Sequence, residues 1–502
     1  MKRFSFVLFG LMFSSLVASV VSGSWPRRAQ ANSYGLTSHS NVVVAKAGET
    51  DEGAINEDAV DTVVHQLMAS RHIPGVSLAV VHEGKLIKTK GYGFLNRELS
   101  VKARPSSLFP IASMSKPLTA TGLMLLVEAG KVDLDAPIST YIAKTPEHWA
   151  DITVRHLLTH TAGLSESVYS GKLSRLAQAD KFVRQAAKAP LDFQPGESWM
   201  YSNTGYYLAA IIIENVSGQP FETFMKARVF DPLAMDQTDA LRASYVSSNQ
   251  AMGYALGSDG RSVAPIDVRL SLLPKLMPSL RGAGSVTSTV LDIARWEMAS
   301  QKGALLSLQR QAEMQQPVVM NSGLTFRYGL GWILEEINGR RMVSHGGNLW
   351  GYSTSIARFP DDQLTVIMLT NKDDEQGDYL ARKVAEQYVP ELKIDADAPA
   401  IADKNPALTA QLLSYVNGYD SAIEFVPEWR IILTTPRGQS IQPEFAAEIK
   451  PGTVEALALV SQSAHANGTR YRYRAQMQEN SRLIHAVVTS DGQVASIGLL
   501  SE

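Results

Sequence analysis

The sequence contains no cysteine among its 502 residues. This absence excludes disulfide bonds, thiolate catalysis and zinc sites with cysteine ligands. It also excludes a lipid-modified N-terminal cysteine as a membrane anchor. Any covalent catalysis must therefore use a different nucleophile.

The chain also lacks an excess of charge of either sign. Its 47 basic and 49 acidic residues give a net charge of −2. No basic surplus is available to neutralise phosphates, so we expect no nucleic-acid partner. An apolar content of 45% and a charged content of 19% are typical of a globular protein with a large core.

Long apolar runs are scarce, because only residues 4 to about 21 form one. This run follows two basic residues and precedes small residues with a candidate cleavage site at 29–31, which indicates a signal peptide over 1–31. A retained N-terminal anchor is the alternative, since the run is at the short limit for spanning a bilayer. We expect a periplasmic or secreted protein that meets a membrane only if this segment is retained.

The order of helical and strand patterns predicts an α/β (α+β) fold. A helix and a β-hairpin precede a large helical insertion, and further antiparallel strands and a helix follow it. The strands are expected to complete one sheet with helices on its faces and a helical lobe beside it, which leaves a pocket between them. The predicted boundaries are a signal peptide over 1–31, a linker over 32–55, a main domain over 56–390, a linker over 391–408 and a small β domain over 409–502.

Ser113 and Lys116 are the first candidate catalytic pair. They stand at i and i+3 where an apolar helix is predicted to begin, so their side chains share one face. A serine hydroxyl needs a base beside it, and a desolvated lysine near a helix N-terminus could have a lowered pKa and take that proton. The structural alternative is a capping serine followed by a solvated lysine.

Two further motifs could complete such a site. Tyr201 and Asn203 follow a Pro-Gly loop entry that could bring a phenol and an amide into a cleft. His345-Gly346-Gly347 follows a strand, and its glycines would let a substrate backbone approach the strand edge. The backbone N–H of Asn348 could then join that of Ser113 as an oxyanion hole. Taken singly, each motif also has a structural reading, as a packed phenol, a helix cap or a strand that ends in a glycine turn.

The three motifs in this order resemble those of the serine β-lactamase and penicillin-binding-protein superfamily. This superfamily includes class C β-lactamases, D-Ala-D-Ala carboxypeptidases and their esterase and D-aminopeptidase relatives. The resemblance covers about residues 57–390, and the Tyr415-x-x-Gly418-Tyr419 stretch is similar to the start of the small β-barrel domain that many members carry. Two similar patterns, Tyr415-Val416-Asn417 and His160-Thr161-Ala162-Gly163, are given no role at the site.

One departure from the family pattern concerns the third motif. The β-lactamases and most penicillin-binding members have Lys-Thr-Gly where this chain has His345-Gly346-Gly347. A permanent cation and a hydroxyl that hold a substrate carboxylate are therefore missing, and His345 supplies charge only when it is protonated. This departure weakens β-lactamase as the main activity, but it leaves acyl transfer open.

The resemblance implies a serine hydrolase that acts through an acyl-enzyme and needs no metal or organic cofactor. Ser113 would be the nucleophile, and Lys116 and Tyr201 would share the proton transfers. Asn203 would orient the substrate carbonyl, and His345 would position Tyr201 or the substrate terminus. The expected partner is a small-molecule or peptide substrate, with a D-amino-acid peptide first, an ester second and a β-lactam third. A non-catalytic binder of wall peptides is the alternative from another class.

Overall fold

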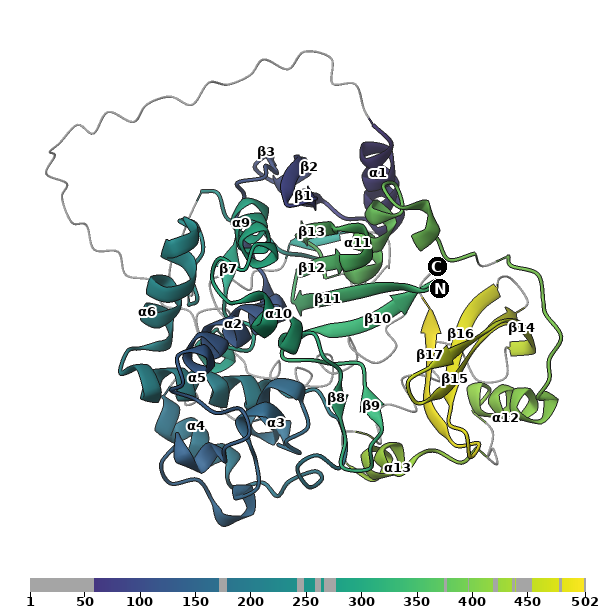
Figure 1. Ribbon diagram of the computed structural model, residues 1–502. Coiled ribbons are helices and arrows are strands. Elements are labelled where there is room, and N and C mark those ends of the chain that lie inside the picture. The colour runs from purple at the N-terminus through teal and green to yellow at the C-terminus, as the bar shows by residue number, and fades with distance from the viewer. Residues whose placement is uncertain are drawn as a thin grey trace, which may run out of the picture.

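The computed structural model describes most of the chain after residue 57 (Figure 1). The described residues are 58–170, 178–241, 248–257, 263–265, 277–373, 377–395, 397–418, 423–435, 438, 454–477 and 481–500. The predicted signal peptide and the linker over 32–55 lie outside them. No helix in the described residues combines the length and the apolar character that a bilayer crossing requires.

A seven-stranded antiparallel sheet forms the centre of the main domain, in the order β10-β11-β12-β13-β1-β2-β3. The first and last parts of the domain meet where β1 pairs with β13, with Val76 opposite Thr370. This arrangement confirms the prediction that strands from both ends complete one sheet. The strands are β1 (Gly75–His82), β2 (Lys85–Asn96), β3 (Val101–Lys102), β10 (Ile333–Ile337), β11 (Arg340–Leu349), β12 (Tyr352–Phe359) and β13 (Leu364–Thr370).

Helices cover both faces of this sheet. Because successive side chains of a strand point to opposite faces, Leu78 and Val80 of β1 pack in one core with α1 (Ala59–Arg71) and α11 (Gly377–Ala385). The intervening Ala79 and Val81 belong to the other core, which includes α9 (Val290–Gln301). The central strands are therefore buried on both sides, which explains their nearly continuous apolar sequence.

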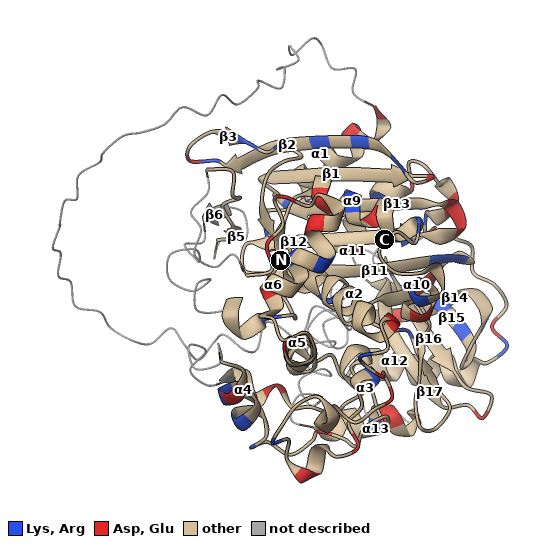
Figure 2. Cartoon of the chain, turned by 60° about the vertical axis from the view of Figure 1, so that its left-hand side comes forward, with Lys and Arg blue, Asp and Glu red and all other residues tan. Residues whose placement is uncertain are grey.

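The helical lobe is built around two buried helices, α2 (Ser115–Glu128) and α5 (Asn203–Ser217), which pack against each other. Both are apolar around most of their circumference, and they carry few charged residues (Figure 2). An all-round apolar helix is stable only in a protein interior. The other helices of this region are α3 (Val154–Thr159), α4 (Ala179–Ala186), α6 (Phe221–Met225) and α10 (Leu308–Met314).

Short strand pairs also lie outside the central sheet among the described residues. The first joins the entry to the Ser113 segment with the residues before α9. The pairs are β4 (Phe109–Pro110) with β7 (Thr287–Ser288), β5 (Tyr254–Leu256) with β6 (Val263–Pro265), and β8 (Val318–Val319) with β9 (Thr325–Phe326).

The C-terminal region is a small β domain, drawn in yellow in Figure 1, with two helices. Its four antiparallel strands follow the chain order, and among the described residues they form an open sheet and no closed barrel. The Asn467-Gly468 turn connects the first two strands, as predicted. The elements are α12 (Pro406–Val416), α13 (Pro427–Thr434), β14 (Val454–His465), β15 (Gly468–Met477), β16 (Ser481–Val488) and β17 (Val494–Leu500).

Candidate active site

Ser113 lies in a tight turn between strand β4 and helix α2. The turn is a single 3₁₀ segment, Ala112–Met114, and Ala112 has a left-handed φ of 47°. A non-glycine residue in this conformation is strained and persists only where its surroundings hold it, as they often do at active sites. Here Ser115 Oγ donates to Ala112 O at 2.6 Å and accepts from Val286 N at 3.1 Å. The turn is therefore fixed from both sides, and it presents Ser113 at the N-terminal end of α2.

Lys116 lies one turn along, fully buried, with its Nζ atom 3.3 Å from Ser113 Oγ. The same nitrogen donates to Asn203 Oδ1 at 2.9 Å and to Ala283 O at 2.8 Å. Burial lowers the pKa of Lys116 well below its usual value, although the Glu166 carboxylate acts in the opposite direction. A neutral amine that uses two N–H groups on these acceptors directs its lone pair towards the serine hydroxyl, which is the arrangement of a general base.

Tyr201 belongs to the turn that precedes α5, and its ring lies beside the Lys116 amine. Lys116 Nζ is 4.5 Å from the centroid of the Tyr201 ring, and the Tyr201 side chain is buried. The ring of His160 packs against it with a centroid separation of 4.4 Å. The phenol, the amine and the Ser113 hydroxyl therefore belong to one cluster, although they come from positions up to 88 residues apart in the chain.

The turn that carries Tyr201 and Asn203 is held by two buried side chains. Ser202 caps α5 by accepting from Gly205 N at 3.1 Å. Glu166 accepts from Ser202 Oγ at 2.8 Å and from Thr204 N at 2.9 Å, which places a carboxylate at the positive end of α5. His160 Nδ1 accepts from Ser202 N at 3.0 Å. These contacts leave little freedom to the residues on either side of Ser202.

Strand β11 forms the opposite wall of the site. It extends past β10, whose pairing with it ends at Ser344, so residues 345–349 have no strand partner on that side in the described structure. Gly347 runs so close to the nucleophile turn that an added Cβ would overlap Ile111 O and lie 3.0 Å from Ser113 N. Strand β11 is therefore in contact with the Ala112–Met114 turn. The same strand carries the Asn348 N–H, which is predicted to form an oxyanion hole with the N–H of Ser113.

His345 is buried, and its ring makes two hydrogen bonds. Its Nε2 atom lies 3.0 Å from Tyr328 Oη, and its Nδ1 atom lies 2.7 Å from Gly346 O. Burial, with a smaller effect from the Lys116 charge, lowers the pKa of His345 to about 3. The ring is therefore neutral at physiological pH, with Nδ1–H donating to the carbonyl and Nε2 accepting from the phenol. At neutral pH it supplies no positive charge for a substrate carboxylate.

The structure brings the predicted site residues together. Ser113, Lys116 and Asn203 form hydrogen-bonding contacts, Tyr201 packs beside them, and Gly347 touches the nucleophile turn. The Asn203 amide oxygen accepts from Lys116, and its contact with a substrate carbonyl stays a prediction. The ring centroid of His345 lies 6.3 Å from that of Tyr201, so the two side chains are neighbours.

Three supporting residues were missed by sequence reasoning. The His160-Thr161-Ala162-Gly163 pattern was given no role because it follows a helical segment and not a strand. The His160 ring nevertheless contacts Tyr201. Glu166 and Tyr328 carry no local signal of their positions, since each acts through partners at least 17 residues away. No three acidic or histidine side chains in the described regions converge as a metal site would require.

A model of the Beta-lactamase family matches residues 60–389, which is more than half of the chain. The chain belongs to the Beta-lactamase family. It is 30% identical over 369 residues to penicillin-binding protein 4* of Bacillus subtilis (strain 168), which covers 70% of this chain and 81% of the relative. The match confirms the predicted resemblance to the serine β-lactamase and penicillin-binding-protein superfamily.

Two solved structures show how far the fold extends. A D-amino acid amidase from Ochrobactrum anthropi SV3, complexed with D-phenylalanine, is 26% identical with a TM-score of 0.57 and covers 66% of this chain and 99% of its own. The octameric penicillin-binding protein homologue from Pyrococcus abyssi is 21% identical with a TM-score of 0.57, and covers 88% of this chain and 98% of its own. The second likeness is one of fold alone, and it reaches beyond the main domain.

Proposed function

We propose that this protein is a serine hydrolase that acts through an acyl-enzyme on amides of D-amino acids, of the kind found in cell-wall peptides. The observation that carries the proposal is the buried contact of Ser113, Lys116 and Asn203, in which an amine of lowered pKa faces a serine hydroxyl. An amine in this state can remove the hydroxyl proton at neutral pH.

In the first half of the reaction, Ser113 Oγ attacks the carbonyl carbon, and its proton passes to Lys116. The negative charge that develops on the carbonyl oxygen is stabilised by the N–H groups of Ser113 and Asn348. The carbon–nitrogen bond then breaks, and the amine leaves with a proton returned by Lys116 or Tyr201. In the second half, water loses a proton to the same base and attacks the ester, which releases the acid and restores the Ser113 hydroxyl.

The neutral His345 ring supports a substrate without a free carboxylate next to the scissile bond. A cation at this position would pair with such a carboxylate, whereas a ring with a pKa of about 3 offers only neutral hydrogen bonds. Amides and internal peptide bonds therefore suit the site better than C-terminal acids do. The name of the similar D-amino acid amidase agrees with this class of substrate.

An ester is the second candidate substrate, favoured by the same neutral ring. Carboxylic esters need no anchoring cation, and an alkoxide leaves more readily than an unprotonated amide nitrogen does. Rates of hydrolysis on D-phenylalanine amide, a D-Ala-D-Ala peptide, p-nitrophenyl butyrate and nitrocefin would rank the amide, acid-terminated peptide, ester and β-lactam classes. We expect the amide or the ester to be hydrolysed faster than the acid-terminated peptide.

Covalent labelling tests the mechanism directly. A fluorescent penicillin or a fluorophosphonate should label wild-type protein at Ser113, and Ser113→Ala should remove both the label and the hydrolysis. A non-catalytic binder of wall peptides would keep its binding in Ser113→Ala and would never show turnover. Absence of label with both probes, in protein shown to be folded by circular dichroism, would refute the proposed mechanism.

A further inference from the structure

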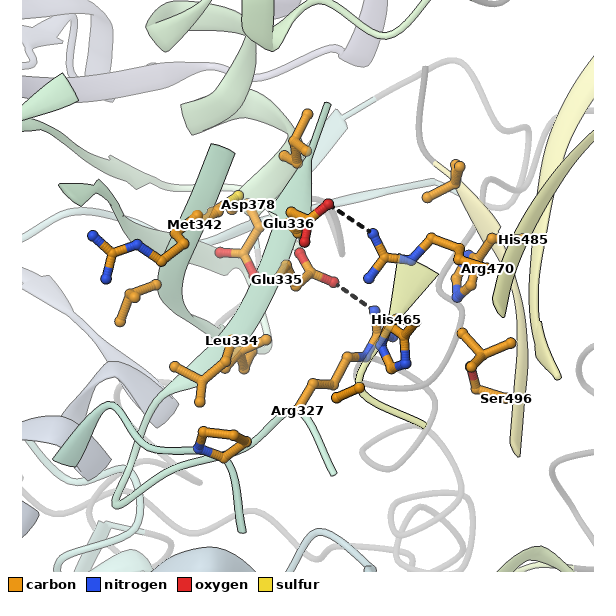
Figure 3. Close-up of a pocket in the computed structure, with 18 of the residues that line it drawn as sticks. Arg327, Leu334, Glu335, Glu336, Met342, Asp378, His465, Arg470, His485 and Ser496 are labelled. Atoms are coloured by element: carbon orange, nitrogen blue, oxygen red, sulfur yellow. Dashed lines mark hydrogen bonds and ion pairs between the residues drawn. The ribbon is translucent and has the colours of Figure 1, made fainter. Parts of the chain in front are cut away.

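A cavity of about 740 Å³ lies between the main domain and the C-terminal β domain, away from Ser113. One wall is formed by β10, β11 and the start of α11, and the other by β14, β15, β16 and β17 (Figure 3). A volume of this size is within the range of small-molecule sites, which lie preferentially between domains. The question is therefore which chemistry its lining would recognise.

Arginine dominates the charged lining of this cavity, with five arginines against three acidic residues. Two of the acids are already paired, Glu335 with Arg327 at 2.9 Å and Glu336 with Arg470 at 3.6 Å (Figure 3). The third, Asp378, is neutral over part of the physiological range because burial raises its pKa to about 7. The acidic residues therefore leave the guanidinium charge of the cavity only partly compensated.

Arg472 is the lining arginine for which the described residues provide no acidic partner. Its guanidinium donates to the neutral amide oxygen of Asn338 at 2.9 Å. Within the described part of the chain, no carboxylate lies in ion-pair range of it. The two other lining arginines differ, because Arg382 pairs with Glu386 and Arg341 pairs with Asp361.

His485 lies directly opposite Arg472 on the neighbouring strand. The register of β15 and β16 pairs these two residues, so their side chains share the face of the sheet that lines the cavity. His485 is 7% exposed, and its Nδ1 atom is buried with no hydrogen-bond partner among the residues that the structure describes. A buried polar atom left unpaired costs free energy, which an oxygen ligand in the cavity would recover.

We propose that this cavity binds a small oxyanionic ligand, a carboxylate or a phosphate, which Arg472 and His485 hold from the C-terminal domain. A planar guanidinium suits either anion, since two parallel N–H groups match two oxygens of the ligand. The imidazole would contribute one N–H from the neighbouring strand. The site is separate from the hydrolytic centre, so this proposal stands whether or not the proposed function is correct.

Isothermal titration calorimetry on the full chain tests the site with two probes, citrate for carboxylates and inorganic phosphate for phosphates. Titrations run in 0.15 M sodium chloride, so that weak surface attraction is screened. We expect saturable binding of one or both probes. Arg472→Gln should weaken that binding by roughly tenfold to a hundredfold, the usual effect of removing a hydrogen bond to a charged group.

Arg474→Gln is the matched control. Arg474 stands two residues further along β15, but its guanidinium donates to Ala398 O at 2.9 Å and does not line the cavity. This variant should bind as the wild type does. Should Arg472→Gln fail to fold, His485→Gln must show the loss instead. Absence of heat from both probes up to 10 mM, or equal losses in Arg472→Gln and Arg474→Gln, would overturn the proposal.

Discussion

Gly347→Ala tests the close approach of strand β11 to the nucleophile turn. An added methyl group would overlap Ile111 O and lie 2.6 Å from Thr354 Oγ1, whereas ordinary contact begins at 3.4 Å. Thr354 Oγ1 donates to Ile111 O at 2.9 Å, so neither atom can move freely. The added carbon would lie 2.2 Å from Ile111 O, so the strand must retreat by about 1.2 Å to restore ordinary contact. A displacement near 1 Å in a catalytic site costs roughly 100-fold in rate, and loss of one oxyanion donor costs about 10²–10³-fold.

The assay is the rate at which a fluorophosphonate labels Ser113, together with turnover of p-nitrophenyl butyrate. The control is Gly346→Ala, one residue earlier in the same strand, whose added Cβ would lie 3.4 Å from Asp378 Oδ1, at the edge of ordinary contact. We expect Gly346→Ala to stay within about threefold of wild type, a change of ~0.7 kcal/mol. If Gly347→Ala labels as fast as Gly346→Ala while both remain folded, β11 does not position the reacting carbonyl.

Three further predictions concern groups around the site and its supports. Lys116→Ala should lower kcat/KM by about 10²–10⁴-fold, and in wild type kcat/KM should rise with pH through a lysine pKa well below 10.5, which a pH–rate profile measures. Ile432→Ala should destabilise the protein by about 2–4 kcal/mol, because Ile432 of α13 packs on Phe193 and Met200 of the segment leading to Tyr201. Calorimetric unfolding measures this loss, and Ile431→Ala should show a smaller one because Ile431 is only half-buried. Asp378 has a pKa raised to about 7, so the folded state keeps a proton that the unfolded state loses above its pKa of 3.8. Stability should therefore fall as pH rises from about 4 to about 7, and Asp378→Asn should flatten that fall.

Local sequence patterns determined the order of elements and the candidate nucleophile. Ser113 and Lys116 stand three residues apart at a helix start, so their contact follows from helix geometry alone. The helix and the β-hairpin predicted before the Ser113 segment are likewise present, as α1 and the β1–β2 pair. Such features depend on a few neighbouring residues, and a single sequence displays them directly.

The protonation states depended on the folded structure. His345 carries an ordinary imidazole, but burial and the Lys116 charge lower its pKa to about 3, and no local pattern records either influence. Burial lowers the pKa of Lys116 as well, because a helix, a loop and the Tyr201 turn surround its side chain.

The supporting contacts also belong to the tertiary structure. Glu166 holds the turn before α5 from 36 residues away, and Gly347 meets Ser113 across 234 residues of chain. A contact between distant positions depends on how the sheet and the lobe pack, and one sequence alone does not specify that packing. The sequence therefore determined which side chains could react, and the folded structure decided their charges and the distances between them.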